Sequence, residues 1–291
     1  MGTNVHLVVV GGDAELLEQA RARIEDLEQR WSRFLPDSEL CQLNRDAGSG
    51  RAKSVSAATF DVVEQAIDAC RETGGLFDPT ILPALVAAGY DRSFDAGLTP
   101  STRRPPARTN TCDGIVLDHE RLSITLPPYC ELDLGGIGKG RAADLVADEL
   151  IDTDRAAGGC INLGGDLRAF GNAPAGAPGW AVGLEQPHDA DEVMLVVGLA
   201  DGALATSSTT KRRWQGEDGV TRHHLIDPRT GEPATTTLAS VSVIASSAMT
   251  AEVHAKASLI AGKPTDETLP MLFVRDDGAR ETFHGFEAYV W

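Results

Sequence analysis

Apolar side chains recur at helical spacing in several parts of the chain. In the first of these parts, Leu16, Ala20, Ile24 and Leu27 stand three or four positions apart, which predicts one apolar face on a helix. Ser56 is placed to cap a second helix at its N-terminus, because its side chain can accept a backbone N–H. Amphipathic helices are predicted over four segments: residues 14–31, 57–73, 138–151 and 247–261.

Short apolar runs bounded by glycine or polar residues predict strands. Residues 4–10 form the first run, and residues 114–117 and 122–126 form a pair joined by a polar turn. Other strands are expected near residues 160–163, 180–184, 193–198, 203–206 and 239–245. Helices and strands do not alternate regularly, so the pattern predicts an α+β fold rather than a doubly wound sheet. The proline-containing residues 93–114 are expected to form an exposed connection.

The composition is that of a globular protein with an acidic surface. The 291 residues include 43 Asp and Glu against 26 Lys and Arg, a formal net charge of −17. A field of that sign repels nucleic acid and anionic lipid, so we expect neither as a partner. A phosphate-containing ligand would then need a locally cationic or metal-assisted site.

Hydropathy gives no sign of a membrane-spanning segment, because no apolar run approaches about 18 residues. We therefore expect no stable membrane insertion. The sequence as given favours a cytoplasmic protein, and it would equally fit an exported or lipid-anchored one whose upstream signal segment had been removed.

Five cysteines are scattered along the chain without a Cys-x-x-Cys pair. Their spacing matches neither a zinc motif nor a disulfide framework. We expect them to be small buried apolar residues.

Two glycine-rich segments could approach a ligand. Residues 133–141 precede a predicted helix, where glycines and the helix N-terminus can receive a phosphate, although neither the P-loop nor the dinucleotide fingerprint fits. A glycine-requiring turn explains the segment equally well. Residues 158–167 predict either a strand end approached by a ligand or another backbone, or a tight hairpin.

A third segment combines residues 205–208 with residues 223–231. Ser208 and Lys211 match the Ser-x-x-Lys pattern of penicillin-interacting enzymes, but a Ser-Asp-Asn partner is missing between Lys211 and Arg229. Serine acylation is therefore disfavoured.

The order of these segments along the chain is specific enough to indicate a protein family. The chain resembles the FAD:protein FMN transferase (ApbE) family from residue 1 to about residue 262. The resemblance rests on eight ordered blocks: Met1 to Thr3, Asp37 to Asn44, Gly75 to Pro83, Asp133 to Arg141, Asn162 to Asp166, Ala205 to Ser207, His224 to Gly231 and Ser242 to Glu252.

The resemblance implies a single α+β domain over residues 1–291, with mixed sheets and flanking helices around a deep FAD cleft. In the family, a Thr or Ser hydroxyl of an acceptor protein attacks the FMN-side phosphorus of FAD. AMP leaves and FMN stays on the acceptor as a phosphoester. A divalent metal, usually Mg²⁺, sits on the diphosphate.

The resemblance also implies roles for individual residues. His224 and Glu252 are the candidate catalytic residues, and the Gly136 carbonyl and Glu252 are the candidate metal ligands. The candidate FAD-binding residues are Met1, Phe34, Leu76, Phe77, Asp78, Asp133, Lys139, Asn162, Asp166, Ser207, Ile226 and Lys256.

The chain departs from the family at the metal segment. The usual Ala-Asp-x-x-Ala-Thr reads Ala251 to Lys256, with Glu252 for Asp and Lys256 for Thr. One hypothesis is that the Lys256 ammonium neutralises the diphosphate directly. A simpler interpretation is a surface ion pair between Glu252 and Lys256, four residues apart on a helix. A third is a metal that shifts slightly and uses Glu252 alone. The sequence thus leaves two classes open: an FMN transferase, or an FAD-binding protein with weak or no transfer activity.

Overall fold

The computed structural model describes residues 3–94, 112–174, 176–216 and 219–291. Within these residues the chain folds as two compact units, of which unit 1 is made from two separate segments and unit 2 from three. Unit 1 contains residues 27–138 and 211–235, and unit 2 contains residues 3–26, 139–210 and 236–291. Both units combine helices with antiparallel strands, so the α+β prediction is confirmed.

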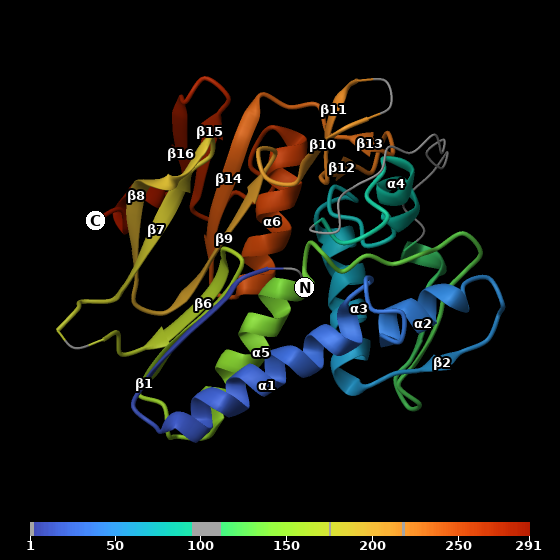
Figure 1. Cartoon of the computed structure of the whole chain (residues 1–291), viewed down its shortest axis with the longest axis horizontal. Coiled ribbons are helices and arrows are strands. Elements are labelled where there is room, and N and C mark those ends of the chain that lie inside the picture. Colours follow the sequence, from blue (N-terminus) through green and yellow to red (C-terminus); the bar gives the residue numbers. More distant parts are fainter. Residues whose placement is uncertain (1–2, 95–111, 175, 217–218) are drawn as a thin grey trace. The chain divides into compact units, whose positions relative to one another are not determined.

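Unit 2 is built on an antiparallel sheet of seven strands in the order β1-β5-β6-β9-β14-β15-β16 (Figure 1). Their bounds are β1 Val5–Val10, β5 Gly158–Leu163, β6 Asp166–Gly171, β9 Gly202–Ser208, β14 Leu238–Ala245, β15 Met271–Arg275 and β16 Arg280–Phe283. A separate ribbon pairs β7 (Trp180–Gln186) with β8 (Asp189–Leu199). The unit also holds α6 (Ala248–Ala261), η3 (Phe286–Tyr289) and most of α1 (Ala14–Trp31) and α5 (Gly138–Asp152).

The two faces of this sheet pack against different partners. Neighbouring residues of a strand point to opposite faces, and Leu204 and Ile244 join the cluster that contains Trp180 and Leu199 of the ribbon. The next residues along these strands, Ala205 and Ala245, pack with Ala251 of α6 instead. The sheet is therefore buried on both faces, between the β7–β8 ribbon and α6.

Unit 1 surrounds α3 (Ala57–Glu72), whose N-cap is Ser56 as predicted. Its other helical elements are α2 (Glu39–Arg45), α4 (Leu82–Ala87) and η2 (Cys112–Gly114). A three-stranded sheet runs in the order β2 (Lys53–Ser54), β4 (Ser123–Thr125), β3 (Val116–Asp118). Two small ribbons pair β10 (Arg213–Gln215) with β11 (Thr221–His223), and β12 (Ile226–Asp227) with β13 (Glu232–Pro233).

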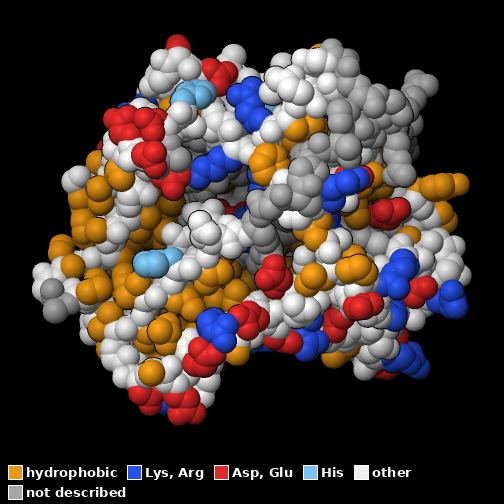
Figure 2. All heavy atoms as spheres, in the orientation of Figure 1, with side chains coloured by type: hydrophobic (Ala, Val, Ile, Leu, Met, Phe, Trp, Pro, Cys, Tyr) orange, Lys and Arg blue, Asp and Glu red, His pale blue; other side chains and the backbone are white. Residues whose placement is uncertain are grey.

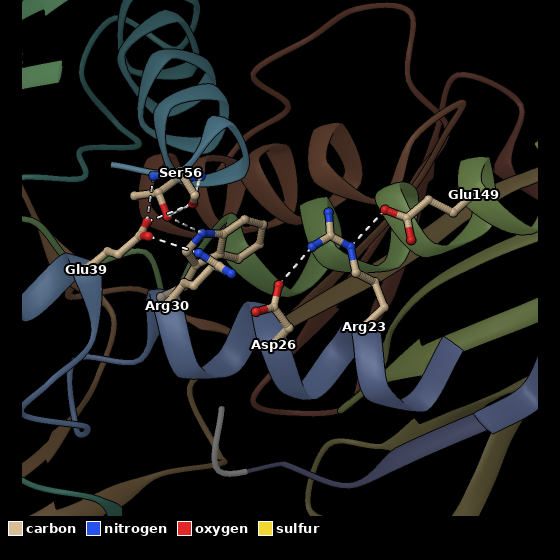
Figure 3. A network of polar contacts seen from close by, with 8 residues as sticks. Arg23, Asp26, Arg30, Glu39, Ser56 and Glu149 are labelled. Atoms are coloured by element: carbon tan, nitrogen blue, oxygen red, sulfur yellow. Dashed lines mark hydrogen bonds and ion pairs between the residues drawn. The ribbon is translucent and has the colours of Figure 1, made fainter. Parts of the chain in front are cut away.

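Charged side chains anchor α1 in each unit (Figure 3). In unit 2, Arg23 Nε lies 2.8 Å from Glu149 of α5, and Arg23 Nη1 lies 2.9 Å from Asp26. In unit 1, Glu39 of α2 accepts a hydrogen bond from Arg30 at 3.0 Å and one from the Ser56 hydroxyl at 2.8 Å. The second contact connects α2 to the cap of α3.

The four predicted helices and the predicted strands are all present in the described residues, with ends shifted by a few positions. The sequence patterns did not predict α2, α4, β2, β6, the ribbon strands β10 to β13, β15 or β16, most of which are short. Most of the expected connection over residues 93–114 lies outside the described residues. Among the helices that are described, none combines the length and the apolarity needed to cross a membrane.

Candidate functional site

Unit 2 contains a buried cluster of three charged side chains, Lys139, Asp166 and Glu252. Lys139 Nζ, from the first turn of α5, contacts carboxylate oxygens of both Asp166 on β6 and Glu252 on α6. The Asp166 and Glu252 side chains are only 5 % and 4 % exposed. The second oxygen of Glu252 accepts the Gly140 backbone N–H at 2.8 Å. The first turn of α5, the start of β6 and the buried helix α6 thus each contribute one side chain to the contacts around the Lys139 ammonium group.

The pKa shifts in this cluster reflect burial and mutual attraction. Burial by itself would lower the pKa of Lys139, but the charges of Asp166 and Glu252 outweigh it and raise that pKa. Burial raises the pKa of Glu252 to about 7, against the attraction of Lys139. We infer that Lys139 stays protonated and that the two carboxylates share its charge, since one cation cannot fully compensate two buried anions.

Close packing of α5 against α6 places Lys139 next to Glu252. A Cβ atom on Gly140 would lie 2.4 Å from the Ala248 carbonyl oxygen, so only glycine allows this approach. One turn later, the Asp144 carboxylate accepts the N–H groups of Ala248 and Met249 at 2.7 and 2.9 Å. Asp144 therefore satisfies the orphan donors at the start of α6.

The middle of α6 is buried on all sides, including its polar residues. Lys256, one turn after Glu252, is 9 % exposed, and Glu252 is 3 % exposed. The interpretation of these two residues as a surface ion pair is therefore wrong. His254 is bound through Nδ1 to the Thr265 hydroxyl at 3.0 Å. Each polar group on this helix requires a buried partner, which is unusual for a purely structural element.

The glycine-rich residues 158–167 form the β5–β6 hairpin. Gly164 and Gly165 occupy the turn with φ angles of +69° and +100°, which L side chains rarely adopt. Asn162 accepts the Gly165 N–H at 2.8 Å and so fixes the turn that precedes Asp166. The tight-hairpin interpretation is correct, and the hairpin places Asp166 in the charged cluster. Ser207 lies half-buried on β9, paired with Val241 of β14.

Unit 1 holds an aromatic cluster around Arg33. The Arg33 guanidinium lies 4.2 Å from the ring centroid of Phe34 and 4.4 Å from that of Tyr90. Its Nε is 2.7 Å from the Asp133 carboxylate, and both side chains are 8 % exposed. The Tyr90 ring also contacts the Trp214 ring, with centroids 5.7 Å apart. The arrangement combines cation–π contacts with a buried ion pair.

This cluster brings together three of the predicted FAD-binding residues. Ile226 of β12 packs in the same apolar core as Tyr90 and Trp214, against which Phe34 also packs. Asp133 joins through Arg33, and its second oxygen accepts the Gly135 N–H at 2.8 Å. The sequence patterns missed three members of the cluster: Arg33, Tyr90 and Trp214. These three residues were missed because they are far apart in the sequence. Only Arg33 could have been identified, because it is adjacent to the predicted residue Phe34.

The other predicted residues of unit 1 lie close to the core. Phe77 and Asp78 are 1 % and 3 % exposed, whereas Leu76 is half-buried. Gly136 stands in the turn before α5. His224 is half-buried between β11 and β12. Met1 lies outside the described residues.

The neighbouring His223 has a structural role. Its Nδ1 accepts the Leu225 N–H at 3.3 Å, so its Nε2 carries the proton and donates to the Ala234 carbonyl at 3.1 Å. Burial also lowers the pKa of His223, which keeps the ring neutral. Asp227 closes the following turn by accepting the backbone N–H of Arg229 at 2.9 Å. The segment that carries His224 is thus held on both sides.

Comparison with known proteins shows which family the chain belongs to. A model of the ApbE family matches residues 1–272. The chain belongs to the ApbE family. The predicted family resemblance is confirmed, and the match extends about ten residues beyond residue 262, where the resemblance seen in the sequence ends.

The names of several proteins similar to this ApbE-family chain state an enzymatic activity. A FAD:protein FMN transferase of Vibrio cholerae is 28 % identical over 97 % of this chain and 87 % of that protein. One of Treponema pallidum is 30 % identical over 84 % of this chain and 71 % of that protein. The crystal structure of the ApbE protein from Thermotoga maritima matches with a TM-score of 0.85 and 26 % identity over 99 % of this chain and 96 % of that one. The flavin transferase ApbE from Vibrio cholerae matches with a TM-score of 0.79 and 25 % identity over the same shares.

Proposed function

We propose that this protein is an FAD:protein FMN transferase. The relatives named above carry that activity in their names and span most of this chain. The structural observation that supports the proposal best is the buried cluster of Lys139, Asp166 and Glu252. Phosphoryl transfer requires neutralisation and positioning of charge more than covalent help from the protein, and this cluster holds a cation among oxygen donors.

The proposed reaction joins FMN to an acceptor hydroxyl. The oxygen of a Thr or Ser side chain of the acceptor protein forms a bond to the FMN-side phosphorus of FAD, and the bond to the bridging oxygen breaks. AMP leaves with the bridging oxygen. The hydroxyl proton must be removed, and His224 is the proposed acceptor because a neutral imidazole suits this task near pH 7. The fixed neighbours His223 and Asp227 hold its segment in place.

The proposed FAD-binding residues include members of each unit, and each set is considered by itself. In unit 1, Phe34 is half-buried, and its ring, packed on the Arg33 guanidinium, is of the kind that binds flat aromatic ligands. In unit 2, we assign the positive charge that a diphosphate requires to Lys256, because the charge of Lys139 is already taken up by Asp166 and Glu252. Such a local positive charge would offset the repulsion that the net negative charge of the protein exerts on a phosphate ligand.

A divalent metal is part of this proposal. Asp166 and Glu252, both in unit 2, supply carboxylate oxygens, the donors that Mg²⁺ prefers. When bound, Mg²⁺ would neutralise charge on the diphosphate. Lys139 already contacts both carboxylates, so the chain also supplies a cation of its own. We propose that Lys256, buried one turn from Glu252, adds positive charge toward the diphosphate.

The test is nucleotide chromatography after incubation of the protein with FAD, a Thr-bearing flavinylation acceptor and either Mg²⁺ or EDTA. We expect AMP release together with an acceptor that gains the mass of FMN. An acceptor with Val in place of Thr should give neither product. Intact FAD in every mixture, with flavin still bound to the protein, would refute the transferase proposal and leave an FAD-binding protein.

Two variants test the proposed residues in the same assay. His224→Asn should lower kcat for AMP release by roughly 100-fold, in the range typical of a lost general base. His284→Asn, a histidine next to β16, is the matched control and should leave kcat unchanged. Lys256→Thr should make the reaction more dependent on Mg²⁺; an unaltered Mg²⁺ dependence would contradict the role given to Lys256.

A further inference from the structure

Three residues with metal-binding donors meet in the interior of unit 1. Cys70 lies near the end of α3, Asp78 lies between α3 and α4, and Cys112 begins η2. Their two sulfur atoms and a carboxylate oxygen all lie within 4.8 Å of one another, and all three residues are buried. In the part of the chain that the structure describes, no other three Cys, His or acidic side chains come together in this way.

The carboxylate of this cluster is incompletely satisfied. Oδ1 of Asp78 accepts hydrogen bonds from the backbone N–H and the hydroxyl of Thr80, at 2.8 and 2.7 Å. Oδ2 is buried and has no hydrogen-bond partner, although Asp78 is only 3 % exposed. A buried carboxylate oxygen without a donor destabilises the fold, and a bound cation would remove that cost.

The separation of Cys112 and Asp78 fits two ligands of a tetrahedral metal centre. Cys112 Sγ lies 3.7 Å from Asp78 Oδ1. Zinc binds thiolate sulfur at about 2.3 Å and carboxylate oxygen at about 2.0 Å, so tetrahedral geometry separates such a pair of ligands by about 3.5 Å. The donors therefore need to move little to take up a cation.

The surroundings are rich in sulfur. Cys130 is fully buried and lies close enough to Cys112 to act on it electrostatically. The hydrogen bond with Cys70, together with burial, raises the pKa of the Cys112 thiol, so without a metal it is neutral. Soft sulfur donors select Zn²⁺ over Mg²⁺, which prefers oxygen alone.

We propose that Cys70, Asp78 and Cys112 form a structural site for a thiophilic divalent cation such as Zn²⁺. Binding one Zn²⁺ releases one proton from each of the two thiols, and leaves two thiolates and one carboxylate on the metal. The cation connects the end of α3 to the Asp78 turn and to η2. This site is separate in chemistry from any Mg²⁺ that serves the diphosphate. It assigns Asp78 to the metal, in place of the FAD-binding role that the family resemblance implied for this residue.

Cobalt titration tests the site directly. The full chain, with any purification tag removed, is stripped with a chelator, kept reduced with a phosphine and titrated with Co²⁺. We expect one Co²⁺ per chain with thiolate-to-cobalt absorption, and displacement of that Co²⁺ by Zn²⁺. The variants Cys70→Ser and Cys112→Ser should lose the absorption. Cys160→Ser, a half-buried cysteine of β5, is the matched control and should keep it.

A second measurement uses only the unmodified protein, so it does not depend on the variants folding. Zn²⁺ should slow alkylation of Cys70 and Cys112 by at least tenfold, mapped by mass spectrometry, and leave Cys160 unaffected. Absent thiolate-to-cobalt absorption, equal alkylation with and without Zn²⁺, or a Cys70–Cys112 disulfide in metal-treated protein would each overturn the proposal.

Discussion

At the scale of single residues, Lys139 is the side chain on which unit 2 most depends. Its ammonium group is in contact with two carboxylates that are almost fully buried. Removing one partner of a buried ion cluster leaves the others desolvated and unpaired, which costs far more than the net contribution of the intact pair. The cluster therefore combines a proposed role in charge neutralisation with a strong effect on folding.

Lys139→Met is expected to lower the free energy of unfolding by about 3–5 kcal/mol, measured by urea denaturation. Adding Glu252→Gln to this variant should restore part of the loss, because one of the two unpaired charges disappears. Lys263→Met, at an exposed position after α6, should change stability by less than about 0.5 kcal/mol. A Lys139→Met variant as stable as this control would contradict the buried cluster.

Residue chemistry explains what the sequence could and could not predict about the site. Lys139, Asp166 and Glu252 were each identified by family resemblance, but nothing in their spacing indicated that Lys139 joins the other two. The contact depends on packing of α5 and of β6 against α6. The cysteines show the same limit: Cys70 and Cys112 have no motif between them, and only the fold of unit 1 brings their sulfurs together. Burial was predicted for all five, and Cys41 and Cys160 are only half-buried.

At the scale of elements, the close approach of α5 and α6 determines the geometry of the charged cluster. The position of Gly140 against the Ala248 carbonyl leaves no room for a side chain. Glycine normally weakens a helix, so its presence inside α5 indicates a packing requirement. Periodicity predicted both helices, but a hydrophobic pattern carries no information about how closely two backbones approach.

Gly140→Ala is expected to lower the free energy of unfolding by about 1–3 kcal/mol or more, because α5 and α6 must separate. Gly138→Ala, two positions earlier, is the matched control, since its Cβ would meet Leu134 only at an ordinary 3.6 Å. The control should be neutral or slightly stabilising. Thermal denaturation of both variants distinguishes the two cases, and equal melting temperatures would refute the packing argument.

The start of α6 is expected to contribute a pH dependence through Asp144. Burial raises its pKa to about 6, against two backbone hydrogen bonds that lower it. The folded state therefore binds this proton more tightly than the unfolded state. Its contribution to stability is full below about pH 4 and is lost as pH rises through about 6.

Asp144→Asn should remove this dependence. Between pH 4 and pH 7, the difference in unfolding free energy between the unmodified protein and the variant should shrink by up to about 3 kcal/mol. Asp148→Asn, exposed on the same helix, is the control and should follow the unmodified protein at each pH. Urea denaturation across this pH range makes the measurement; a difference that grows with pH would show that the sign is wrong.

At the scale of the whole molecule, the acidic composition and the nature of the proposed substrate oppose each other. The formal net charge is −17, and FAD carries a diphosphate. On the face drawn in Figure 2, Asp and Glu side chains lie among Lys and Arg side chains, so attraction for phosphate is local. Over distances longer than about 10 Å, the net charge decides the sign of the force at low salt.

The association rate of FAD is therefore expected to rise severalfold as ionic strength increases from about 10 mM to about 300 mM, because salt screens the long-range repulsion. Stopped-flow flavin fluorescence measures this rate. Riboflavin, which has no phosphate, should associate at a rate that does not depend on salt. A rate for FAD that falls with salt would mean that the local cations dominate at long range as well.

The fold class could be predicted from the irregular order of helices and strands along the chain. Hydrophobic patterns also predicted the helices longer than two turns and the longer apolar strands. Short elements such as α2 and α4 were missed because six or seven residues carry too little periodicity. The division into two units was not predicted either. A single domain over residues 1–291 stays a prediction, since the segments of both units alternate along the chain.

That alternation has a consequence for synthesis on the ribosome. Unit 1 takes its last segment from residues 211–235, and unit 2 takes its last from residues 236–291. The strand β8 even receives its final partner from Trp291, whose N–H donates to the Val196 carbonyl at 3.0 Å. Neither unit can therefore be completed while the downstream residues are still in the exit tunnel, and half-made chains must be kept from aggregating until translation has passed these points.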